Sequence, residues 1–296
     1  MRASSKRRKV KRLGIGIGGL LMLGAVVVFL GSGFSGCMSF SITEQEAVER
    51  FRSRNLDPPA FVTKDTNPGA IHFASIGEGQ DTVVFVHGSP GSWSAFIRFM
   101  MDEDLRKSAR LISVDRPGFG QSKPLKAVPS IREQSRRIHD ALFQSGVSSN
   151  VILVGHSLAG PVIARMALDY PEFVKSLILV APSMDPELEK RKWYNYLAKF
   201  PLVKWSISTD WANSNDEIFP HKEELIELAE MLPSLHTPTI VIQGMEDQLV
   251  PPGNADYVEQ MMSGADRLEI WRIEGLNHFV PWSRPDLITK AIQQLI

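Results

Sequence analysis

Apolar residues gather along the chain in short continuous runs, separated by stretches with helical spacing. Six runs rich in β-branched or aliphatic residues occur at 82–86, 111–114, 151–154, 177–180, 239–242 and 268–273. Such runs, too continuous for a half-exposed sheet, are typical of parallel strands buried on both faces. Helical spacing occurs around 131–143, 158–168, 255–262 and 285–296. The alternation predicts a doubly wound α/β domain with a mostly parallel sheet.

One interval interrupts this alternation. Between Pro182 and Pro238 there is no convincing strand, but aromatic residues crowd together at Trp193, Tyr194, Tyr196, Phe200, Trp205, Trp211 and Phe219. We interpret residues 183–236 as an inserted helical cap, which begins where a strand ends and so lies over the ligand side of the sheet. We expect its tryptophans 193, 205 and 211 to face the pocket and influence substrate choice. Packing onto the core is the simpler expectation for most of the aromatics.

The segments before the core have their own patterns. In residues 38–69, Thr43 and Glu46 form a capping-box sequence that predicts a short helix through about Ser53. Two proline-containing stretches, 57–59 and 67–69, predict a linker. The core is then expected in two parts, 70–182 and 237–296, on either side of the cap.

Residues 1–37 differ from the rest of the chain. Seven basic residues within positions 2–12 precede an uncharged apolar run from 13 to 34, which ends in Ser35-Gly36-Cys37. A basic flank, an apolar run and small residues are the parts of an export signal. The end of the run resembles the lipobox of bacterial lipoproteins, with Cys37 as the lipidation site, although Phe34 stands where that family usually has Leu. An uncleaved signal anchor is the alternative, because the run is long enough to span a bilayer. Both interpretations predict a bacterial membrane protein whose remaining chain faces the extracytoplasmic side.

Charge and cysteine content limit the possible functions. The formal net charge is zero, but setting the seven N-terminal basic residues aside leaves 26 basic residues against 33 acidic ones. An acidic body argues against nucleic acid as a partner. A lone cysteine excludes an internal disulfide. No cluster has metal-ligand spacing, so neither a metal nor another cofactor is expected.

The first chemical motif is a sharp turn between a strand and a helix. Gly155-His156-Ser157-Leu158-Ala159-Gly160 directly follows the run at 151–154. A serine on such a turn is exposed for nucleophilic attack, and backbone N–H groups of the new helix face it. Small residues are required because the two backbones approach closely. Taken alone the motif is weak, since serine is also a common helix cap.

Three further segments give the turn its context. Ser89 lies in a Gly-rich turn, residues 86–91, after an earlier strand; Asp247 follows the run at 239–242; and His278 follows the last run. The order Ser, Asp, His, each after a different parallel strand, suits the nucleophile-elbow architecture. Asp185, just past the run at 177–180, is an alternative acid. We favour Asp247 because its strand ends in a compact turn at Gly244.

With Asp115-Arg116-Pro117-Gly118-Phe119-Gly120-Gln121-Ser122 added to these motifs, the chain from about Ala70 to Ile296 resembles the α/β-hydrolase superfamily. The resemblance implies that Ser157, Asp247 and His278 are nucleophile, acid and base, and that the backbone N–H groups of Ser89 and Leu158 are the oxyanion donors. Ala159 departs from the glycine most frequent there. Epoxide hydrolases and haloalkane dehalogenases share the fold but use an aspartate nucleophile, so Ser157 argues against both.

The expected function is hydrolysis of a small-molecule carboxylic ester or related acyl compound through an acyl-enzyme. An acyltransferase or perhydrolase with the same triad is one alternative, and a non-catalytic surface binding protein of this fold is another. Trp93, just after the Ser89 turn, is assigned to the substrate-binding wall, with core packing as its alternative. His156 and His87 are expected to be structural. Partners for His72, His139, His221 and His236 are not evident in the sequence.

Overall fold

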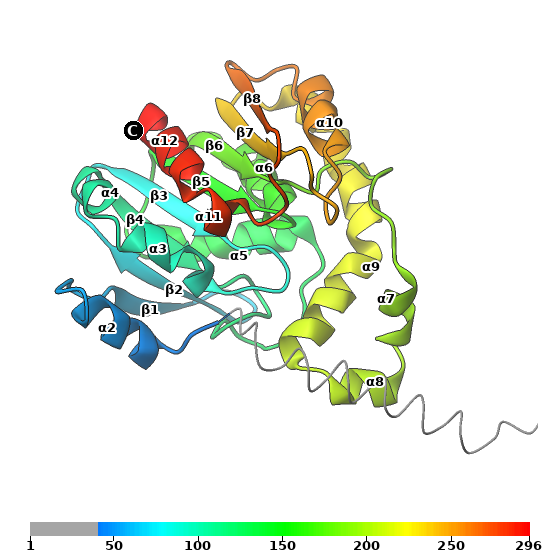
Figure 1. The fold of residues 1–296 in the computed structure, drawn as a ribbon, viewed down its shortest axis with the longest axis horizontal. Helices are drawn as coiled ribbons and strands as arrows, with labels where there is room; N and C mark the ends of the chain where they lie inside the picture. The colour runs from blue at the N-terminus through cyan, green and yellow to red at the C-terminus, as the bar shows by residue number, and fades with distance from the viewer. Residues whose placement is uncertain (1–40) are drawn as a thin grey trace, which may run out of the picture. The chain divides into compact units, whose positions relative to one another are not determined.

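An eight-stranded sheet forms the centre of the computed structural model, which describes residues 41–296 (Figure 1). The strands are β1 (Ala60–Asp65), β2 (Ala70–Ile76), β3 (Asp81–Val86), β4 (Ala109–Val114), β5 (Val151–His156), β6 (Val174–Val180), β7 (Thr239–Gly244) and β8 (Leu268–Ile273). Their order is β1-β2-β4-β3-β5-β6-β7-β8. β3 to β8 are parallel, whereas β1 and β2 pair antiparallel at one edge. All six predicted strands and the doubly wound fold are confirmed.

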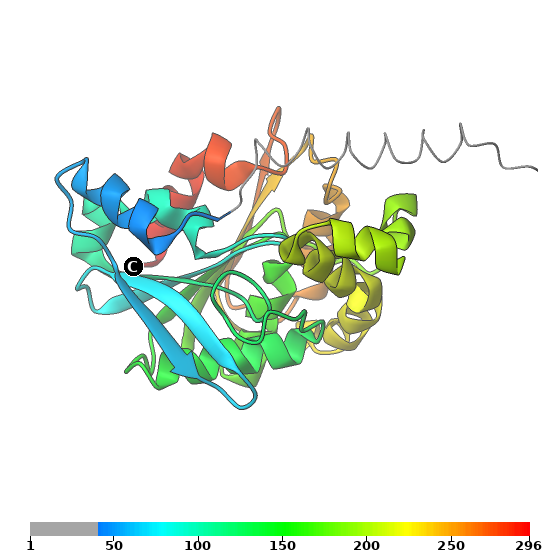
Figure 2. The same ribbon diagram turned by 90° about the horizontal axis from the view of Figure 1, so that it is seen from below.

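Helices cover both faces of the sheet (Figures 1 and 2). The α-helices are α2 (Glu44–Arg52), α3 (Ile97–Met100), α4 (Glu103–Ser108), α5 (Ile131–Phe143), α6 (Ala159–Asp169), α7 (Trp193–Leu197), α8 (Pro201–Ser206), α9 (Thr209–Ala229), α10 (Gly253–Met261), α11 (Val280–Ser283) and α12 (Pro285–Leu295), and the 3₁₀ helices are η1 (Trp93–Phe96) and η2 (Leu232–Ser234).

Alternate residues of each central strand point to opposite faces and build two separate cores. In β3, Val84 and Val86 pack in one cluster with residues of α5, α6 and α10. Val83 and Phe85 pack in the other cluster, with residues of η1, α3, α4 and α12. Burial on both faces explains why these strands read as continuous apolar runs.

The N-terminal part agrees with one expectation and corrects another. The capping box at α2 is confirmed, since the Thr43 side chain accepts from the Glu46 N–H and the Glu46 carboxylate accepts from the Thr43 N–H. The segment assigned to a linker, however, contains β1, which pairs with β2 along its whole length. β1 is an edge strand with exposed and half-buried positions, so its apolar content is too low to show as a buried run.

The segment between β6 and β7 is helical, as its sequence predicts. Within residues 183–236, which we call the insertion, the structure has α7, α8, α9 and η2 and no strand. α9 contributes Leu225 and Leu228 to the core. α7 and α8 lie on the outer side of α9, away from the sheet (Figure 1).

The expectations for residues 1–37, including lipidation of Cys37, lie outside the described residues. None of the helices within residues 41–296 is long and apolar enough to cross a membrane.

Candidate active site

Ser157 occupies the turn between β5 and α6 in a strained backbone conformation. Its φ is +58°, in the left-handed region that residues other than glycine rarely adopt. The turn is held because the Ser157 N–H donates to Val180 O (2.9 Å) and the Gly160 N–H donates to Ser157 O (2.9 Å). Strand and helix approach so closely that a Cβ on Gly155 would crowd Ala159 O and Ile163. The strain presents a half-buried serine at the carboxyl edge of the sheet, between two buried neighbours.

Asp247 and His278 form a buried pair beyond the ends of β7 and β8. His278 Nδ1 donates to Asp247 Oδ2 at 2.7 Å. The other carboxylate oxygen, Oδ1, accepts from the N–H groups of Leu249 (2.9 Å) and Val250 (2.8 Å). Three donors therefore fix the carboxylate, and the carboxylate fixes the imidazole tautomer that leaves Nε2 able to accept a proton.

Close contact between two loops brings this pair together. The Met245 N–H donates to Ile273 O (3.0 Å) and the Glu246 N–H donates to Leu276 O (2.9 Å). A Cβ on Gly244 would overlap the Leu276 carbonyl oxygen, so the glycine is required by the approach of the loops. Asp185, the alternative acid, instead accepts from the Glu187 N–H (2.8 Å) and caps a local turn.

His156 connects the serine turn to the histidine loop. Its Nε2 donates to the His278 carbonyl oxygen at 3.0 Å, and the two imidazole rings lie 4.7 Å apart. Burial, together with the neighbouring His278, lowers the pKa of His156 to about 3, so it is neutral near neutral pH. Ser157 and the His278–Asp247 pair are thus neighbours through His156, but the Ser157 hydroxyl itself makes no hydrogen bond within residues 41–296.

The turn after β3 lies against the serine. A Cβ on Gly88 would be 3.0 Å from Ser157 Cβ. The next residue, Ser89, and Leu158 have backbone N–H groups that donate to no acceptor in the described part of the chain. Such unpaired backbone donors beside a nucleophile are the ingredients of an oxyanion hole.

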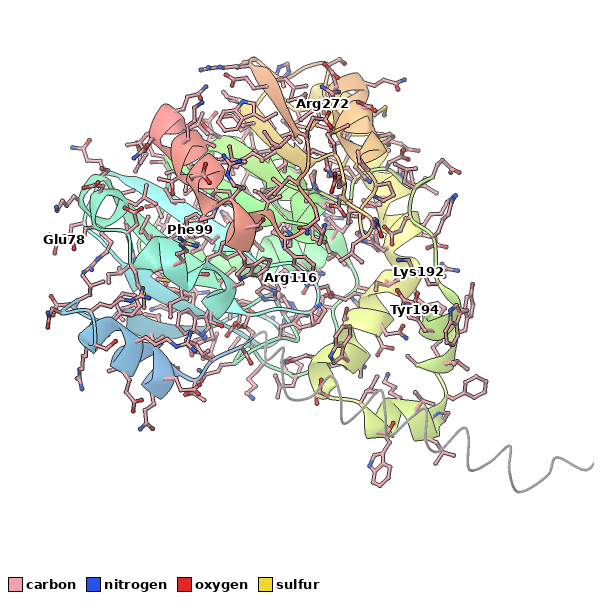
Figure 3. All side chains as sticks on the ribbon, in the orientation of Figure 1. Glu78, Phe99, Arg116, Lys192, Tyr194 and Arg272 are labelled. Carbon is pink, nitrogen blue, oxygen red and sulfur yellow. The ribbon has the colours of Figure 1, made fainter. Side chains whose placement is uncertain are left out.

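A buried ion pair fixes the same turn, and sequence reasoning missed it. Arg116, after β4, donates to His87 O (2.8 Å) and Gly88 O (3.0 Å). Its guanidinium also donates to both carboxylate oxygens of Glu217 on α9, at 3.0 and 3.1 Å. Glu217 Oε2 in turn accepts from the Ser89 hydroxyl at 2.9 Å. Figure 3 shows Arg116 near the centre of the molecule, between the sheet and α9. We call Arg116, Glu217 and the Ser89 side chain the clamp.

Both charges of the clamp are almost fully buried, at 0% and 1% exposure. Burial raises the pKa of Glu217, and the adjoining Arg116 opposes that shift. Burial and the positive charge of Arg116 lower the pKa of His87, which accepts from the Arg116 N–H and donates to Gly88 O. His87 is therefore neutral and orders the turn. No sequence signal reveals Glu217, because it stands 101 positions from its partner.

The structure corrects the predicted role of Trp93 in the substrate-binding wall. Trp93 is only 2% exposed and packs with Ala47, Phe51 and Met100 beneath α2, with its ring 5.3 Å from Phe61. The tryptophan thus belongs to the core, and the substrate-binding assignment is withdrawn. The apolar surface that α2 brings over the sheet is what buries it.

The structure also corrects the predicted positions of the tryptophans in the insertion. Trp193, Trp205 and Trp211 are 71%, 88% and 45% exposed, so these tryptophans neither line a closed pocket nor pack into the core. Trp193 and Trp205 are exposed because α7 and α8 lie outside α9 (Figure 1), and Trp211 is in the first turn of α9, far along the helix from the core residues Leu225 and Leu228.

Four histidines without evident sequence partners have distant ones. His72 contacts Asp115 (2.8 Å), His221 contacts Ser183 (3.2 Å), His139 stacks on Tyr170 and His236 lies near Asp266. Within residues 41–296 no group of three His, Cys, Asp or Glu side chains is arranged to hold a metal ion.

Comparisons with known proteins agree with this architecture. A family model described as the alpha/beta hydrolase fold matches residues 81–207. A 2-hydroxy-6-oxononadienedioate/2-hydroxy-6-oxononatrienedioate hydrolase of Pseudomonas sp is 24% identical over 270 residues, which cover 78% of this chain and 93% of the relative.

Solved structures share the fold as well. One of Est816, an N-acyl homoserine lactone degrading enzyme, has a TM-score of 0.66 at 18% identity and covers 79% of this chain and 100% of its own. One of a membrane phospholipase A, a bacterial virulence factor, has a TM-score of 0.64 at 21% identity and covers 94% and 96%. The chain therefore has the α/β-hydrolase fold.

Proposed function

We propose that the protein is a serine hydrolase that cleaves a small-molecule carboxylic ester. The observation that carries the proposal is the buried Asp247–His278 pair beside a serine held at φ +58°. A structural serine has no need of strained backbone, and strain of this kind concentrates at functional sites. The unpaired backbone N–H groups of Ser89 and Leu158 would stabilise the negative charge that develops on the carbonyl oxygen.

The reaction proceeds in two balanced halves. Ser157 Oγ attacks the ester carbonyl carbon while His278 Nε2 takes the hydroxyl proton. The Ser89 and Leu158 N–H groups stabilise the oxyanion, a contribution of about 3 kcal/mol per donor. The carbon–oxygen bond then breaks, and His278 returns the proton to the leaving alcohol. Water repeats the sequence on the acyl-enzyme and releases the carboxylic acid, with Asp247 stabilising the imidazolium in both halves.

A fluorophosphonate probe tests the nucleophile. We expect one adduct on Ser157, located by mass spectrometry of peptides, and no adduct in the His278→Ala variant. An ester panel of graded acyl length then tests the reaction. Folded wild-type protein that neither reacts with the probe nor turns over any ester would instead favour the non-catalytic binding protein.

Carbon–carbon bond hydrolysis is a second candidate, because the curated Pseudomonas relative is a hydrolase of that kind over most of both chains. Its substrates are dioates by name. Arg116, the buried cation that contacts the Gly88 turn, is already neutralised by Glu217 and offers no free charge to a carboxylate. We therefore rank ester cleavage first. Turnover of a 2-hydroxy-6-oxo dienoate above that of the best ester would reverse the order. An acyltransferase or perhydrolase is detected by adding alcohol or peroxide acceptors and analysing the products.

We also propose that residues 1–37 attach the protein to the outer face of a bacterial membrane, supported by their basic flank, apolar run and cysteine. Cys37→Ser should abolish acylation and processing if the segment is a lipoprotein signal. An unchanged mass and unchanged membrane extraction in this variant would leave the signal anchor instead.

A further inference from the structure

The outer helices of the insertion expose an unusual amount of apolar surface. Seven large apolar side chains between positions 193 and 205 are each at least 46% exposed: Trp193, Tyr194, Tyr196, Leu197, Phe200, Leu202 and Trp205. We call these seven residues the outer patch. Exposed apolar residues scattered singly are normal, but a contiguous group marks an interaction site.

An ordinary surface helix buries its apolar side chains and exposes its polar ones. In α7 and α8 this arrangement is largely reversed. In α7 the buried residue is Asn195, whose side chain donates to Asn215 on α9 at 3.0 Å. From α8, Lys204 Nζ contacts Asp216 of α9 at 2.6 Å. Polar groups therefore help to attach these helices to α9, whereas most of their aromatic and aliphatic side chains are exposed.

Aromatic contacts fix the same arrangement. Tyr196 packs edge-on against Phe219 of α9, with ring centroids 5.5 Å apart, and Lys199 lies 3.3 Å above the Phe219 ring. Because both polar and aromatic contacts hold α7 on α9, the side chains of the outer patch have a fixed position in the folded protein. Figure 3 labels Lys192 and Tyr194 at the α7 side of the insertion.

The charge of this region is opposite to that of the body. Residues 190–209 include five basic residues and no acidic one: Lys190, Arg191, Lys192, Lys199 and Lys204. Two of the five, Arg191 and Lys204, form ion pairs with carboxylates of α9, which leaves the excess positive charge on Lys190, Lys192 and Lys199. The chain after position 37 carries more acidic than basic residues. A basic, aromatic-rich face on an acidic body would orient the protein toward a negatively charged surface.

We propose that the outer patch binds the surface of an anionic phospholipid bilayer. Tryptophan, tyrosine and leucine with neighbouring lysine and arginine form the chemistry that enters the headgroup region of a membrane. Protein–protein interfaces are instead depleted of lysine. A second copy of the chain would bring like charges together across a twofold contact, and the chain's own apolar segment is preceded by seven basic residues of the same sign.

The test uses the full chain reconstituted in phosphatidylcholine vesicles with and without phosphatidylglycerol, with brominated acyl chains as tryptophan quenchers. We expect strong quenching only with phosphatidylglycerol. The Trp193→Phe/Trp205→Phe variant should lose most of the quenchable fluorescence. Phenylalanine keeps the apolar contact with the bilayer, but the two tryptophan fluorophores of the outer patch are removed. Trp271→Phe/Trp282→Phe should retain that signal.

A second pair of variants tests the contact itself while keeping both reporters. Phe200→Ser/Leu202→Ser should lower the equilibrium constant for contact of the outer patch with the bilayer about tenfold or more, seen as a loss of vesicle-dependent quenching, because each large apolar side chain removed from a lipid contact is worth a factor of that order. The matched control is Leu125→Ser/Phe143→Ser, which removes two other exposed apolar side chains (45% and 59%) and should change nothing.

Surface binding does not require the catalytic proposal, and the two can fail separately. Ser157→Ala should be quenched like wild type, and Phe200→Ser/Leu202→Ser should hydrolyse a short water-soluble ester like wild type. Equal quenching without phosphatidylglycerol, or no effect of Phe200→Ser/Leu202→Ser, would overturn the proposal. So would sedimentation of the detergent-solubilised chain as a dimer that this variant dissociates, which would assign the patch to a second copy.

Discussion

On its inner side the insertion buries polar residues and pairs them, whereas on its outer side it exposes apolar residues and leaves them uncovered. α9 buries Asn213, Asn215, Glu217 and His221, and each has a hydrogen-bond partner. α8 buries no residue at all, and its Trp205 is 88% exposed.

The contrast shows that exposure in this protein follows from which surface a helix must meet. A buried charge is tolerable only when it is paired, as Glu217 is with Arg116. An exposed tryptophan contributes little to the stability of the fold, whereas a partner that removes it from water gains free energy. The inner side therefore contacts the Ser89 turn beside Ser157 through Glu217, and the outer side remains in contact with solvent.

The largest expected effects fall on chemistry, which lies entirely outside the insertion. Ser157→Ala and His278→Ala should each lower kcat by about a million-fold, and Asp247→Asn by about ten thousand-fold, the losses typical of such triads. Asp185→Asn should be mild, because its carboxylate caps a turn. Steady-state kinetics on the best ester, with circular dichroism to confirm folding, measures the series. If Asp185→Asn proves crippling while Asp247→Asn retains most turnover, the acid is misassigned.

The clamp is expected to give the next largest effect. Glu217→Gln leaves Arg116 buried without its counter-charge, so unfolding free energy should fall by about 3–5 kcal/mol. The matched control is Glu223→Gln on the same helix, whose ion pair with Arg191 is exposed to solvent and should leave the unfolding free energy almost unchanged. Urea unfolding of both variants gives the comparison.

The values of kcat and KM for the folded Glu217→Gln enzyme test whether Glu217 also positions the Ser89 turn, because a residue that only stabilises the fold would leave both unchanged. Because Glu217 accepts from the Ser89 hydroxyl beside the oxyanion donors, kcat should fall with little change in KM. A variant that loses stability but keeps wild-type kcat would show that the clamp holds the insertion without positioning the Ser89 turn.

Acid is expected to destabilise the site side of the molecule. The pKa of His156 is about 3 when folded against an ordinary value of 6.5. Below pH 6.5 the His156 imidazole therefore binds a proton in the unfolded chain but stays neutral in the folded protein. The free energy of unfolding falls as the pH drops toward 3, by up to about 1.4 kcal/mol per pH unit.

Urea unfolding between pH 7 and pH 4 in about one-unit steps measures this slope. His156→Gln, which can still donate to the His278 carbonyl, should make the slope shallower, and the remaining slope is expected from buried His87, whose pKa is also lowered. The exposed His236→Gln is the control and should leave the slope unchanged. Equal slopes in wild type and His156→Gln would contradict the assignment.

The smallest effect is expected on the outer patch. Leu202→Ser and Trp205→Ser should change unfolding free energy by no more than about 0.5 kcal/mol, because both side chains are already in water. Leu228→Ala, at 1% exposure on the inner side, should cost about 2–5 kcal/mol. Comparable losses at Trp205 and Leu228 would mean that the outer patch is covered in the folded protein.

The sequence by itself predicted the fold and the residues of the candidate site. Strands buried on both faces must be apolar throughout, which made β3 to β7 readable. The chain order of Ser157, Asp247 and His278 follows from their places after parallel strands. The Thr43 capping box was readable because its two partners are three residues apart. Each of these signals is local, or repeats with the period of its element.

Only the tertiary structure decided the rest. β1 was hidden because an edge strand needs few apolar residues, and its pairing with β2 supplies its stability. Trp93 became a core residue because α2 covers it, while Trp205 remained exposed because its helix packs through polar groups instead. Composition assigns an aromatic side chain no direction, and the clamp joins residues 101 positions apart. Burial and long-range pairing depend on which elements meet in space, and that information is absent from any local stretch of sequence.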